Sequence, residues 1–593
     1  MLGQSSLRPL ATALLIGAVT ACSSAAGHAA FVPQPAPAFA AAAKIRVSKK
    51  RVSFVGAGTT QLITVSERGF AGVLHVKSDD VHVAKVKPRK LRRGSGAFEI
   101  VPVSGGKATI TVSDSNGNSA NVEVSVTALT LVLKSVPASA ASVTINAEFG
   151  SIIGASSVAL GGSAKNCKTV AGKRNCTISI APNFGTAKKP VGTVTNIVLM
   201  NFLDSSKNIV ANVRFYAKVT AAKFTSVEVP LLTFSSMQSV PGYPYTLAAG
   251  SDGRVWYVDP HNGTVGAAAP GGAVATYQQG RIGQSFNQAA SFALGSQGKL
   301  WMAVIAYDYT VENAYVDSIS PSGAIAPYSV TKPVTGCSQF NWNQPLSIAA
   351  GADGNLWYLE MIPKVDCSVT YGIGVMSQSG IVLHDYTLPQ DSSGKPIYTF
   401  WSNAQQHEIA AGPDGAMYFW ASKCALSSNT CTGTTTSSAI GRITTTGAQS
   451  FTPVQGLTNC QSGYLARGGD GNVWFGAGCV PAGTPYAHTT IGRVTNAGIT
   501  LFYGQNTWAM DYPLLDLAEG PDGNLYMPAQ GQFGRFVTTG ASVGQIDEYD
   551  TPLNRGGHFL NSMVTGPDHN LYASDCGACV PRGGSYLERI SLP

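Results

Sequence analysis

Hydrophobic and polar residues alternate with a period of two over many short segments of this chain, a pattern that predicts β-strands. Clear examples are residues 61–65, 108–112 and 121–126. Asn116 and Gly117 lie between the last two segments, and Asn-Gly favours a tight hairpin turn. Repeated strands separated by turns predict an all-β protein.

A second pattern comes in seven copies. Each copy has Gly, any residue, Asp, Gly, any residue, an aliphatic residue and then Trp or Tyr, with Gln297 replacing the Asp once and His569 replacing the second Gly once. The copies begin at Gly250, Gly295, Gly351, Gly412, Gly468, Gly520 and Gly566. Their spacing of 45 to 61 residues, with about four strands in each repeat, predicts a seven-bladed β-propeller over residues 223–593.

The last repeat has room for only three strands before the chain ends. Residues 224–231, just before the first repeat, alternate in the right way to supply the fourth. A ring closed by both ends of the propeller segment would leave no free sheet edge.

The repeats resemble those of the virginiamycin B lyase (streptogramin lyase) family. The likeness covers residues 224–593 and includes Ile-Gly-Arg-Ile at 440–443 and Glu-Tyr-Asp-Thr-Pro at 548–552. The resemblance implies a propeller and Mg²⁺-dependent elimination that opens a cyclic ester. One fold hosts many functions, so it is more specific for fold than for activity.

In that family, a His five residues before the first Gly of a copy pairs with a Glu nine residues after it. His407 is the only His at the first position, and its own repeat has Ala421 at the second. Glu360 occupies the acid position one repeat earlier, where Leu346 replaces the His. The resemblance thus makes His407 the candidate base and Glu360 the candidate Mg²⁺ ligand, with little streptogramin turnover expected. The alternative is that His407 only caps a strand; no cofactor is expected unless the lyase function holds.

The N-terminus predicts export. Residues 1–22 contain a short apolar run that ends in Val-Thr-Ala-Cys, which resembles a lipobox with Cys22 as the lipidated residue. Cleavage after Ala29 or Ala30 is the alternative. Residues 23–43 form a Pro- and Ala-rich linker. The expected location is the bacterial cell envelope, periplasmic or at the cell surface, with a lipid anchor in the membrane.

Eleven cysteines become ten when Cys22 is set aside, an even number that suits disulfides in an exported protein. Neighbours in sequence predict five bonds. The expected pairs are Cys167 with Cys176, Cys337 with Cys367, Cys424 with Cys431, Cys460 with Cys479, and Cys576 with Cys579.

Two further domains precede the propeller. Residues 44–127 resemble bacterial Ig-like modules, and residues 128–222 predict a second Ig-like sandwich. The first contains 14 Lys and Arg against 6 Asp and Glu, so the whole net charge of +8 lies there. This charge favours contact with anionic envelope polymers or lipid head groups. Protection of sheet edges by lysine is the equal alternative, and nucleic acid is excluded by export.

The long insertions and the propeller cysteines all fall in loops that open on one propeller face. Candidate ligand-binding residues on this face are Glu360, Asp259, Asp575, Trp342, Trp401 and Trp508. The alternatives are that the tryptophans pack under the long loops and that the acids are solvated on the rim. The first functional prediction is therefore a surface protein whose propeller face binds a small molecule, glycan or protein. The alternative is a lyase-like enzyme with His407 as base.

Overall fold

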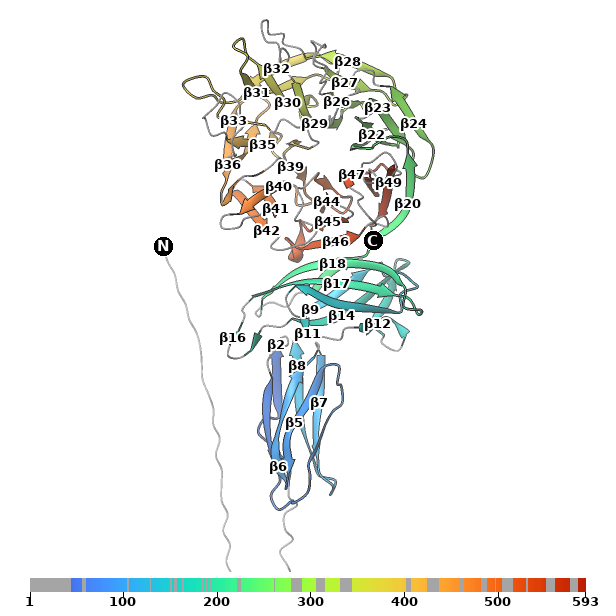
Figure 1. Cartoon of the computed structure of the whole chain (residues 1–593), viewed down its shortest axis with the longest axis vertical. Helices are drawn as coiled ribbons and strands as arrows, with labels where there is room; N and C mark the ends of the chain where they lie inside the picture. Colours follow the sequence, from blue (N-terminus) through green and yellow to red (C-terminus); the bar gives the residue numbers. More distant parts are fainter. Residues whose placement is uncertain are drawn as a thin grey trace, which may run out of the picture.

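The structure is a computed structural model of the chain (Figure 1). It describes residues 44–55, 60–103, 106–127, 129–149, 152–153, 157–162, 165–182, 185–186, 189–190, 193–220, 226–260, 262–278, 291–304, 315–330, 344–400, 407–423, 437–458, 460, 463–481, 488–495, 497–503, 516–529, 532–550, 560–575 and 585–592. The predicted signal segment, Cys22 and the linker lie outside these residues. In the described ranges, no helix is long and apolar enough to cross a membrane.

Residues 44–127, here called the first unit, form two four-stranded sheets around one apolar core. One sheet has the order β1 (Arg46–Val47), β3 (Gln61–Ser66), β6 (Ser95–Pro102) and β5 (Ala84–Arg92). The other has the order β2 (Arg51–Val55), β8 (Ser119–Thr127), β7 (Gly106–Ser113) and β4 (His75–Ser78). Ile63, Phe98 and Ile110 are fully buried between the sheets, as the period-two alternation predicts.

Residues 129–230, the middle unit, also form two sheets. The first begins with β12 (Ser157–Ala159), β10 (Ser142–Phe149), β17 (Thr193–Leu203) and β18 (Ile209–Thr220). The second has β11 (Ile152–Ile153), β14 (Lys173–Pro182), β9 (Leu129–Lys134) and β19 (Ser226–Pro230), with β13 (Cys167–Val170) also paired to β14; β15 (Gly185–Thr186) and β16 (Lys189–Pro190) form a separate hairpin.

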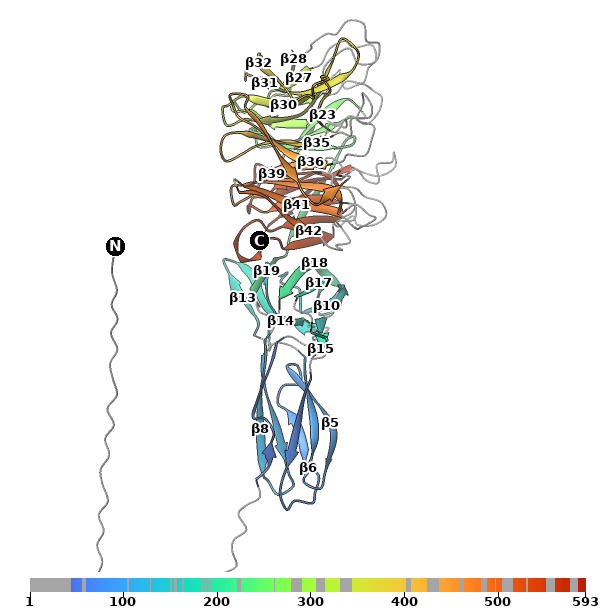
Figure 2. The same cartoon turned by 90° about the vertical axis from the view of Figure 1, so that its left-hand side faces the viewer.

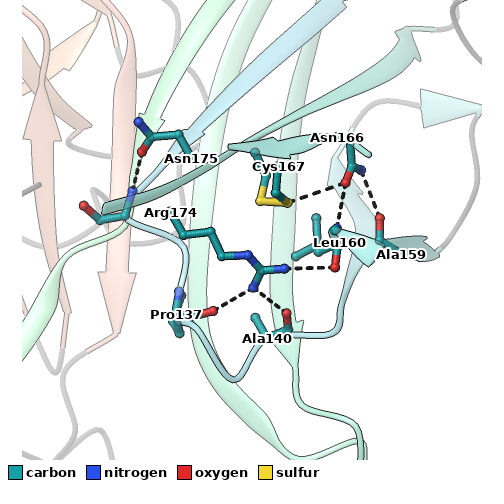
Figure 3. Close-up of a disulfide and its surroundings, with 11 residues drawn as sticks. Pro137, Ala140, Ala159, Leu160, Asn166, Cys167, Arg174 and Asn175 are labelled. Carbon is teal, nitrogen blue, oxygen red and sulfur yellow. Dashed lines mark hydrogen bonds between the residues drawn. A yellow bond between two sulfur atoms is a disulfide. The ribbon is translucent and has the colours of Figure 1, made fainter. Parts of the chain in front are cut away.

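The predicted Cys167–Cys176 disulfide is confirmed (Figure 3). The two cysteines are direct partners across the β13–β14 hairpin. Beside them, the Arg174 guanidinium donates hydrogen bonds to the carbonyl oxygens of Pro137, Ala140 and Leu160. The disulfide closes the β13–β14 hairpin, and Arg174 ties this hairpin to the loop between β9 and β10 and to the residue that follows β12.

Each of the seven copies lies in its own sheet, here called a repeat sheet and numbered in chain order. The first three repeat sheets contain, in turn, β21 (Thr246–Ala249), β22 (Val255–Asp259), β23 (Thr264–Ala268) and β24 (Val274–Gln278); β25 (Ser291–Leu294), β26 (Leu300–Val304), β27 (Tyr315–Ile319) and β28 (Ile325–Ser329); and β29 (Gln344–Ala350), β30 (Leu356–Pro363), β31 (Val369–Met376) and β32 (Val382–Thr387). The fourth and fifth sheets have five strands each: β33 (Tyr398–Thr399), β34 (Ile409–Ala411), β35 (Met417–Lys423), β36 (Ser437–Ile443) and β37 (Gln449–Val454); and β38 (Leu457–Thr458), β39 (Gly463–Arg467), β40 (Val473–Pro481), β41 (His488–Thr495) and β42 (Gly498–Tyr503). The sixth sheet contains β43 (Ala518–Glu519), β44 (Leu525–Ala529), β45 (Gln532–Phe536) and β46 (Ile546–Asp550), and the seventh contains β47 (Leu560–Thr565), β48 (Leu571–Asp575), β49 (Ser585–Ser591) and β20 (Thr233–Val240).

The repeat sheets are arranged around a common centre, with β29, β39 and β47 on the inside and β24, β28 and β20 on the rim (Figure 1). Seen from the side, this ring, the middle unit and the first unit follow one another in a line (Figure 2). The arrangement is that of a propeller on a stalk.

The strand that completes the seventh repeat sheet differs from the prediction. The alternating residues 224–231 were expected there, but β19 (Ser226–Pro230) pairs in parallel with β9 of the middle unit. The next strand, β20, pairs with β49 and completes the sheet. The prediction was wrong because residues 224–231 alternate, whereas β20 has a register shift between Phe234 and Ser236 and shows no regular alternation. Alternation alone does not say which partner a strand takes.

The middle unit is joined to the ring by strand pairing. Its strand β18 pairs with β46, the outer strand of the sixth repeat sheet, so the two sheets are continuous. Arg214 and Glu548 lie 3.7 Å apart across this junction, and the Tyr549 hydroxyl donates to the Pro230 carbonyl at 2.9 Å. Apolar residues of both parts share one core. The stalk is therefore packed against the ring and not connected by a linker alone.

The Asp of the Gly-x-Asp-Gly turn holds the turn and the following aromatic residue together, which accounts for its recurrence in the copies. In the first copy, Asp252 accepts hydrogen bonds from the backbone N–H of Arg254 and from Trp256 Nε1 four residues on. Gly253 supplies the positive φ of the turn at +80°. The same Asp-to-aromatic bond forms in five other copies, at Asp353, Asp414, Asp470, Asp522 and Asp568.

Arginines of the third strands complete this anchor. Arg442, Arg493, Arg535 and Arg589 each lie within ion-pairing distance of the turn Asp of their own repeat sheet. This pairing explains the Ile-Gly-Arg motif of the third strand. The turn, the aromatic residue and the third strand are thus tied together by one carboxylate.

Candidate functional site

Each repeat sheet has two ends that differ in chemistry. At the turn end, the Gly-x-Asp-Gly turn joins the first strand to the second. At the loop end, the first strand begins and the second strand ends, and the long insertions follow. His407 lies at the loop end, directly before β34.

His407 is paired with a carboxylate that the sequence analysis did not single out. Its Nδ1 lies 2.6 Å from Oδ1 of Asp516, which is 109 residues later in the chain. The His407 side chain is 28% exposed, whereas that of Asp516 is 1% exposed. His407 also has a positive φ of 64°, which is unusual for a residue with a Cβ. Strained backbone of this kind is often found at functional sites.

Asp516 is held from several directions. Its Oδ2 accepts hydrogen bonds from the Ser562 hydroxyl at 2.7 Å and the Met563 backbone N–H at 3.2 Å. Its Oδ1 accepts one from the backbone N–H of Leu517 at 2.8 Å. All of these partners donate, so the carboxylate acts as the acceptor and His407 Nδ1–H as a donor.

The position of Asp516 belongs to a ring of buried polar residues. It is the fourth residue before the first Gly of each copy, and it is buried in all seven. Its occupants are Thr246, Ser291, Ser347, Glu408, Tyr464, Asp516 and Ser562. Several of these side chains accept a hydrogen bond from the backbone of the next repeat sheet, as Ser291 does from Ile348 and Ser562 from Leu247. The ring of side chains therefore links neighbouring sheets near the axis.

Glu408 is the exception in this ring. Its backbone N–H donates to Ser347 Oγ, but neither carboxylate oxygen has a hydrogen-bond partner. The neighbouring Leu465 N–H, in the next repeat sheet, donates instead to the His407 carbonyl at 2.6 Å. Burial raises the pKa of Glu408 well above its ordinary value, because the buried site disfavours the charged carboxylate.

The other predicted acids are buried rather than exposed on the rim. Glu360 in β30, Asp259 at the end of β22 and Asp575 at the end of β48 have fully buried side chains. Asp259 accepts hydrogen bonds from the backbone and side chain of Asn262, so it organises the turn after β22. The described residues contain no group of three or more His, Cys, Asp or Glu that could hold a metal ion.

Glu588 is a second buried acid that sequence reasoning missed. It lies on β49 opposite Ala573, whereas other repeat sheets place an aromatic residue opposite a glycine, as in Tyr257 with Gly266 and Phe475 with Gly492. Both carboxylate oxygens lack a hydrogen-bond partner. Burial, with a smaller contribution from Asp575, raises the pKa of Glu588 to about 8.

The cysteines agree with the prediction where they are described. Cys460 and Cys479 form a disulfide at the loop end of the fifth repeat sheet. Cys367 is also disulfide-bonded. Other predicted residues lie outside the described part of the chain: Cys337, Cys424, Cys431, Cys576, Cys579, Trp342, Trp401 and Trp508.

No family model matches the chain, and no curated protein matches it. Solved structures similar to it include a streptogramin B lyase, with 18% identity over 60% of this chain and 98% of that one at a TM-score of 0.38. Virginiamycin B lyase from Staphylococcus aureus has 17% identity over 60% and 99% at a TM-score of 0.39. A gluconolactonase from Xanthomonas campestris has 12% identity over 61% and 90% at a TM-score of 0.32. The similar structures are thus virginiamycin B lyase and related propeller proteins, at low identity.

A sequence signal for Asp516 did exist. Asp516 occupies the fourth residue before the first Gly of its copy, directly after the position that His407 occupies in its own copy. Across the seven copies, this position contains five hydroxyl-bearing residues and two carboxylates. A column of polar residues at the start of apolar strands indicates a buried polar network.

Proposed function

We propose that the loop end of the ring is an active site in which His407 acts as a general base on a small ligand. One observation carries the proposal: the 2.6 Å contact between Nδ1 of a partly exposed His407 and Oδ1 of a buried Asp516. A histidine oriented by a buried carboxylate is the arrangement that general base catalysis uses.

The hydrogen bonds set the direction of proton transfer. Asp516 accepts the Nδ1 proton of His407, so the neutral imidazole has its lone pair on Nε2. Nε2 can then take a proton from the ligand or from a water molecule. The positive charge that forms on the ring is stabilised by the Asp516 carboxylate.

The reaction class that we propose is β-elimination from a cyclic or open ester, with ester hydrolysis as the neighbouring possibility. In the elimination, Nε2 takes a proton from the ligand. The C–H electron pair becomes the new C=C bond, and the C–O bond breaks to leave a carboxylate. Both classes need only a base and stabilisation of the developing negative charge.

Mg²⁺ does not fit the described residues. Glu360 was the candidate ligand, but no group of three or more metal-binding side chains occurs in the described ranges. The proposed steps therefore use protein side chains alone.

Ligand binding without turnover is the second candidate. It is favoured by the disulfide between Cys460 and Cys479, which fixes the loop end of the fifth repeat sheet between the sheets that contribute His407 and Asp516. A stapled loop face is typical of recognition surfaces.

The test measures turnover by the full chain of virginiamycin B, a simple lactone and an activated aryl ester. The variants are His407→Gln and Asp516→Asn, and the control is His384→Gln, an exposed histidine on the outer strand β32. We expect turnover of a panel member to fall about 10²-fold or more in both site variants and to persist in the control. Virginiamycin B itself is expected to be a poor substrate, because Leu346 and Ala421 replace the family's His and Glu.

Two results would decide against catalysis. If no panel member reacts above the buffer rate while the protein melts normally, the enzymatic proposal is overturned. If a panel member binds, and His407→Gln weakens binding without any turnover in the parent protein, the second candidate replaces it.

We further propose that the ring has seven blades, that the two stalk units are Ig-like, and that the protein is exported and anchored by a lipid on Cys22. The support is the seven repeat copies, the two-sheet units and the apolar run before Val-Thr-Ala-Cys. Mass spectrometry of the mature N-terminus tests the anchor. A free amino terminus downstream of Cys22 would overturn it.

A further inference from the structure

The first unit has an unusual charge distribution. Of its 14 Lys and Arg residues, 11 have described side chains, and all 11 are exposed. They are Lys44, Arg46, Lys49, Lys50, Arg51, Arg68, Lys77, Lys85, Lys87, Arg93 and Lys107. Among these described cations, only Arg51 forms an ion pair, with Glu123.

Four of the six acidic side chains of the first unit are buried or accept hydrogen bonds from the backbone. Glu67 and Asp114 are buried. Asp79 accepts the Thr109 backbone N–H, and Asp80 accepts the backbone N–H groups of His82 and Val83. The surface of the first unit is therefore more positive than its composition alone suggests.

Part of this charge is organised along one edge of the unit. Strands β4 and β5 are the edge strands of the two facing sheets and follow each other in the chain. Lys77 on β4 and Lys85 and Lys87 on β5 are exposed. Lys85 and Lys87 are two residues apart, so their side chains leave the same side of the strand about 6.6 Å apart.

We propose that this β4–β5 edge of the first unit binds an acidic polymer, such as a polysaccharide with repeated carboxylate groups. Three exposed cations spread over two neighbouring edge strands match a chain of repeated negative charges better than they match a single small anion. The first unit stands at the opposite end of the molecule from the ring (Figure 2), so a polymer bound there leaves the loop end free. This proposal does not depend on the proposed function of His407.

Protection of the sheet edges does not account for all of the charge. Edge protection needs a charge on each free strand and nothing elsewhere. Lys107 lies on β7, which pairs with a strand on each side, and Lys49 and Lys50 lie between β1 and β2. A flat membrane is also a poorer match, because β1, β2, β4 and β5 present cations at both edges of the unit, and a plane can meet only one of them.

The experiment measures binding of the full chain to immobilised polygalacturonate over a range of salt concentrations. The variant replaces Lys77, Lys85 and Lys87 with Gln. The matched control replaces Lys165, Lys168 and Lys207 with Gln, which removes three exposed charges from the middle unit. We expect the edge variant to bind about tenfold more weakly or worse, the control to change less than about twofold, and binding to fall as salt approaches about 0.5 M.

Two outcomes would overturn the proposal. Equal weakening in the edge variant and the control would show attraction by net charge and no site at this edge. Binding to phosphatidylglycerol vesicles without binding to the polymer would assign the edge to a membrane surface. Unchanged melting temperatures of both variants would show that neither result comes from misfolding.

Discussion

The two ends of the repeat sheets treat the same chemical group in opposite ways. At the turn end, Asp414, Asp470 and Asp568 accept several hydrogen bonds and face an arginine, and these contacts hold their pKa values below the ordinary range despite partial burial. Away from the turns, Glu408 at the loop end and Glu588 in the middle of β49 have carboxylate oxygens that are buried without a hydrogen-bond partner, and burial raises their pKa values.

This difference separates scaffold from site. The turn end repeats one network in six of the seven copies, so its carboxylates serve the fold. At the loop end, the position of Asp516 is occupied by Thr, Ser, Glu, Tyr or Asp in different copies, and burial favours the neutral form of Glu408 there. Perturbed, unpaired acids are common at functional sites, and they cost stability that the repeated turns can supply.

The largest effect that would sharpen this comparison is expected at Glu588. Its folded-state pKa of about 8 lies above the unfolded value of 4.5. The stabilising contribution is therefore complete below pH 4.5 and is lost as the pH rises through 8, because the unfolded chain releases the proton first. We expect the free energy of unfolding to fall by about 4 kcal/mol over this window.

Glu588→Gln should remove this loss. Denaturant unfolding from pH 4.5 to 8 would measure it, with the exposed Glu123→Gln as the control. An unchanged slope in the Glu588 variant would mean that the carboxylate is not buried as a neutral acid.

At the turn end, in contrast, removing a carboxylate should lower the stability of the protein. Asp470→Ala leaves Trp474 Nε1 and the backbone N–H of Asn472 without their acceptor and removes the partner of Arg493. Each unpaired buried donor costs about 1–3 kcal/mol, so we expect a destabilisation of about 3 kcal/mol in denaturant unfolding.

Asp470→Asn is the matched variant for this test. It keeps an acceptor oxygen and loses the charge, so it should cost about 1 kcal/mol. Equal losses in the Ala and Asn variants would show that the ion pair with Arg493 dominates and that the Trp474 bond contributes little.

The sequence predicts the scaffold well because the scaffold contacts are local. The bond from Asp470 to Trp474 spans four residues, and hairpins pair neighbouring strands, so both leave a pattern in the chain. The His407–Asp516 pair joins the fourth repeat sheet to the sixth, and nothing in the local sequence states how many sheets separate them. The sequence did not predict that β20, and not residues 224–231, completes the seventh repeat sheet. It also did not predict the pairing of β18 with β46, for the same reason.

His569 offers a smaller test within the turn end. It occupies the position of the second Gly of the copy and has a positive φ of 57°. His569→Gly should stabilise the protein by about 1 kcal/mol, because glycine accepts this conformation without steric cost. The melting temperature of the variant measures the effect, with His569→Ala as a control that should not stabilise. A neutral or lower value for the Gly variant would show that the His569 side chain compensates for its backbone.

The last test is at Gln297, where the turn Asp is missing. Replacing Gln297 by Asp should restore the hydrogen bond between the turn and the aromatic residue in this copy. The second copy has Gln297 in place of Asp, and Trp301 Nε1 in that repeat sheet is buried without a hydrogen-bond partner. Gln297→Asp should place a carboxylate four residues before Trp301, the spacing that serves Trp256, Trp357 and Trp474. A hydrogen bond gained by a buried donor is worth about 1 kcal/mol, so the variant should unfold at a higher denaturant concentration. Gln297→Ala is the control, since it removes the exposed side chain without offering an acceptor. If both variants are equally stable, the Asp-to-aromatic bond is not what the repeated turn contributes, and the contrast between the two ends would have to rest on the arginine pairs alone.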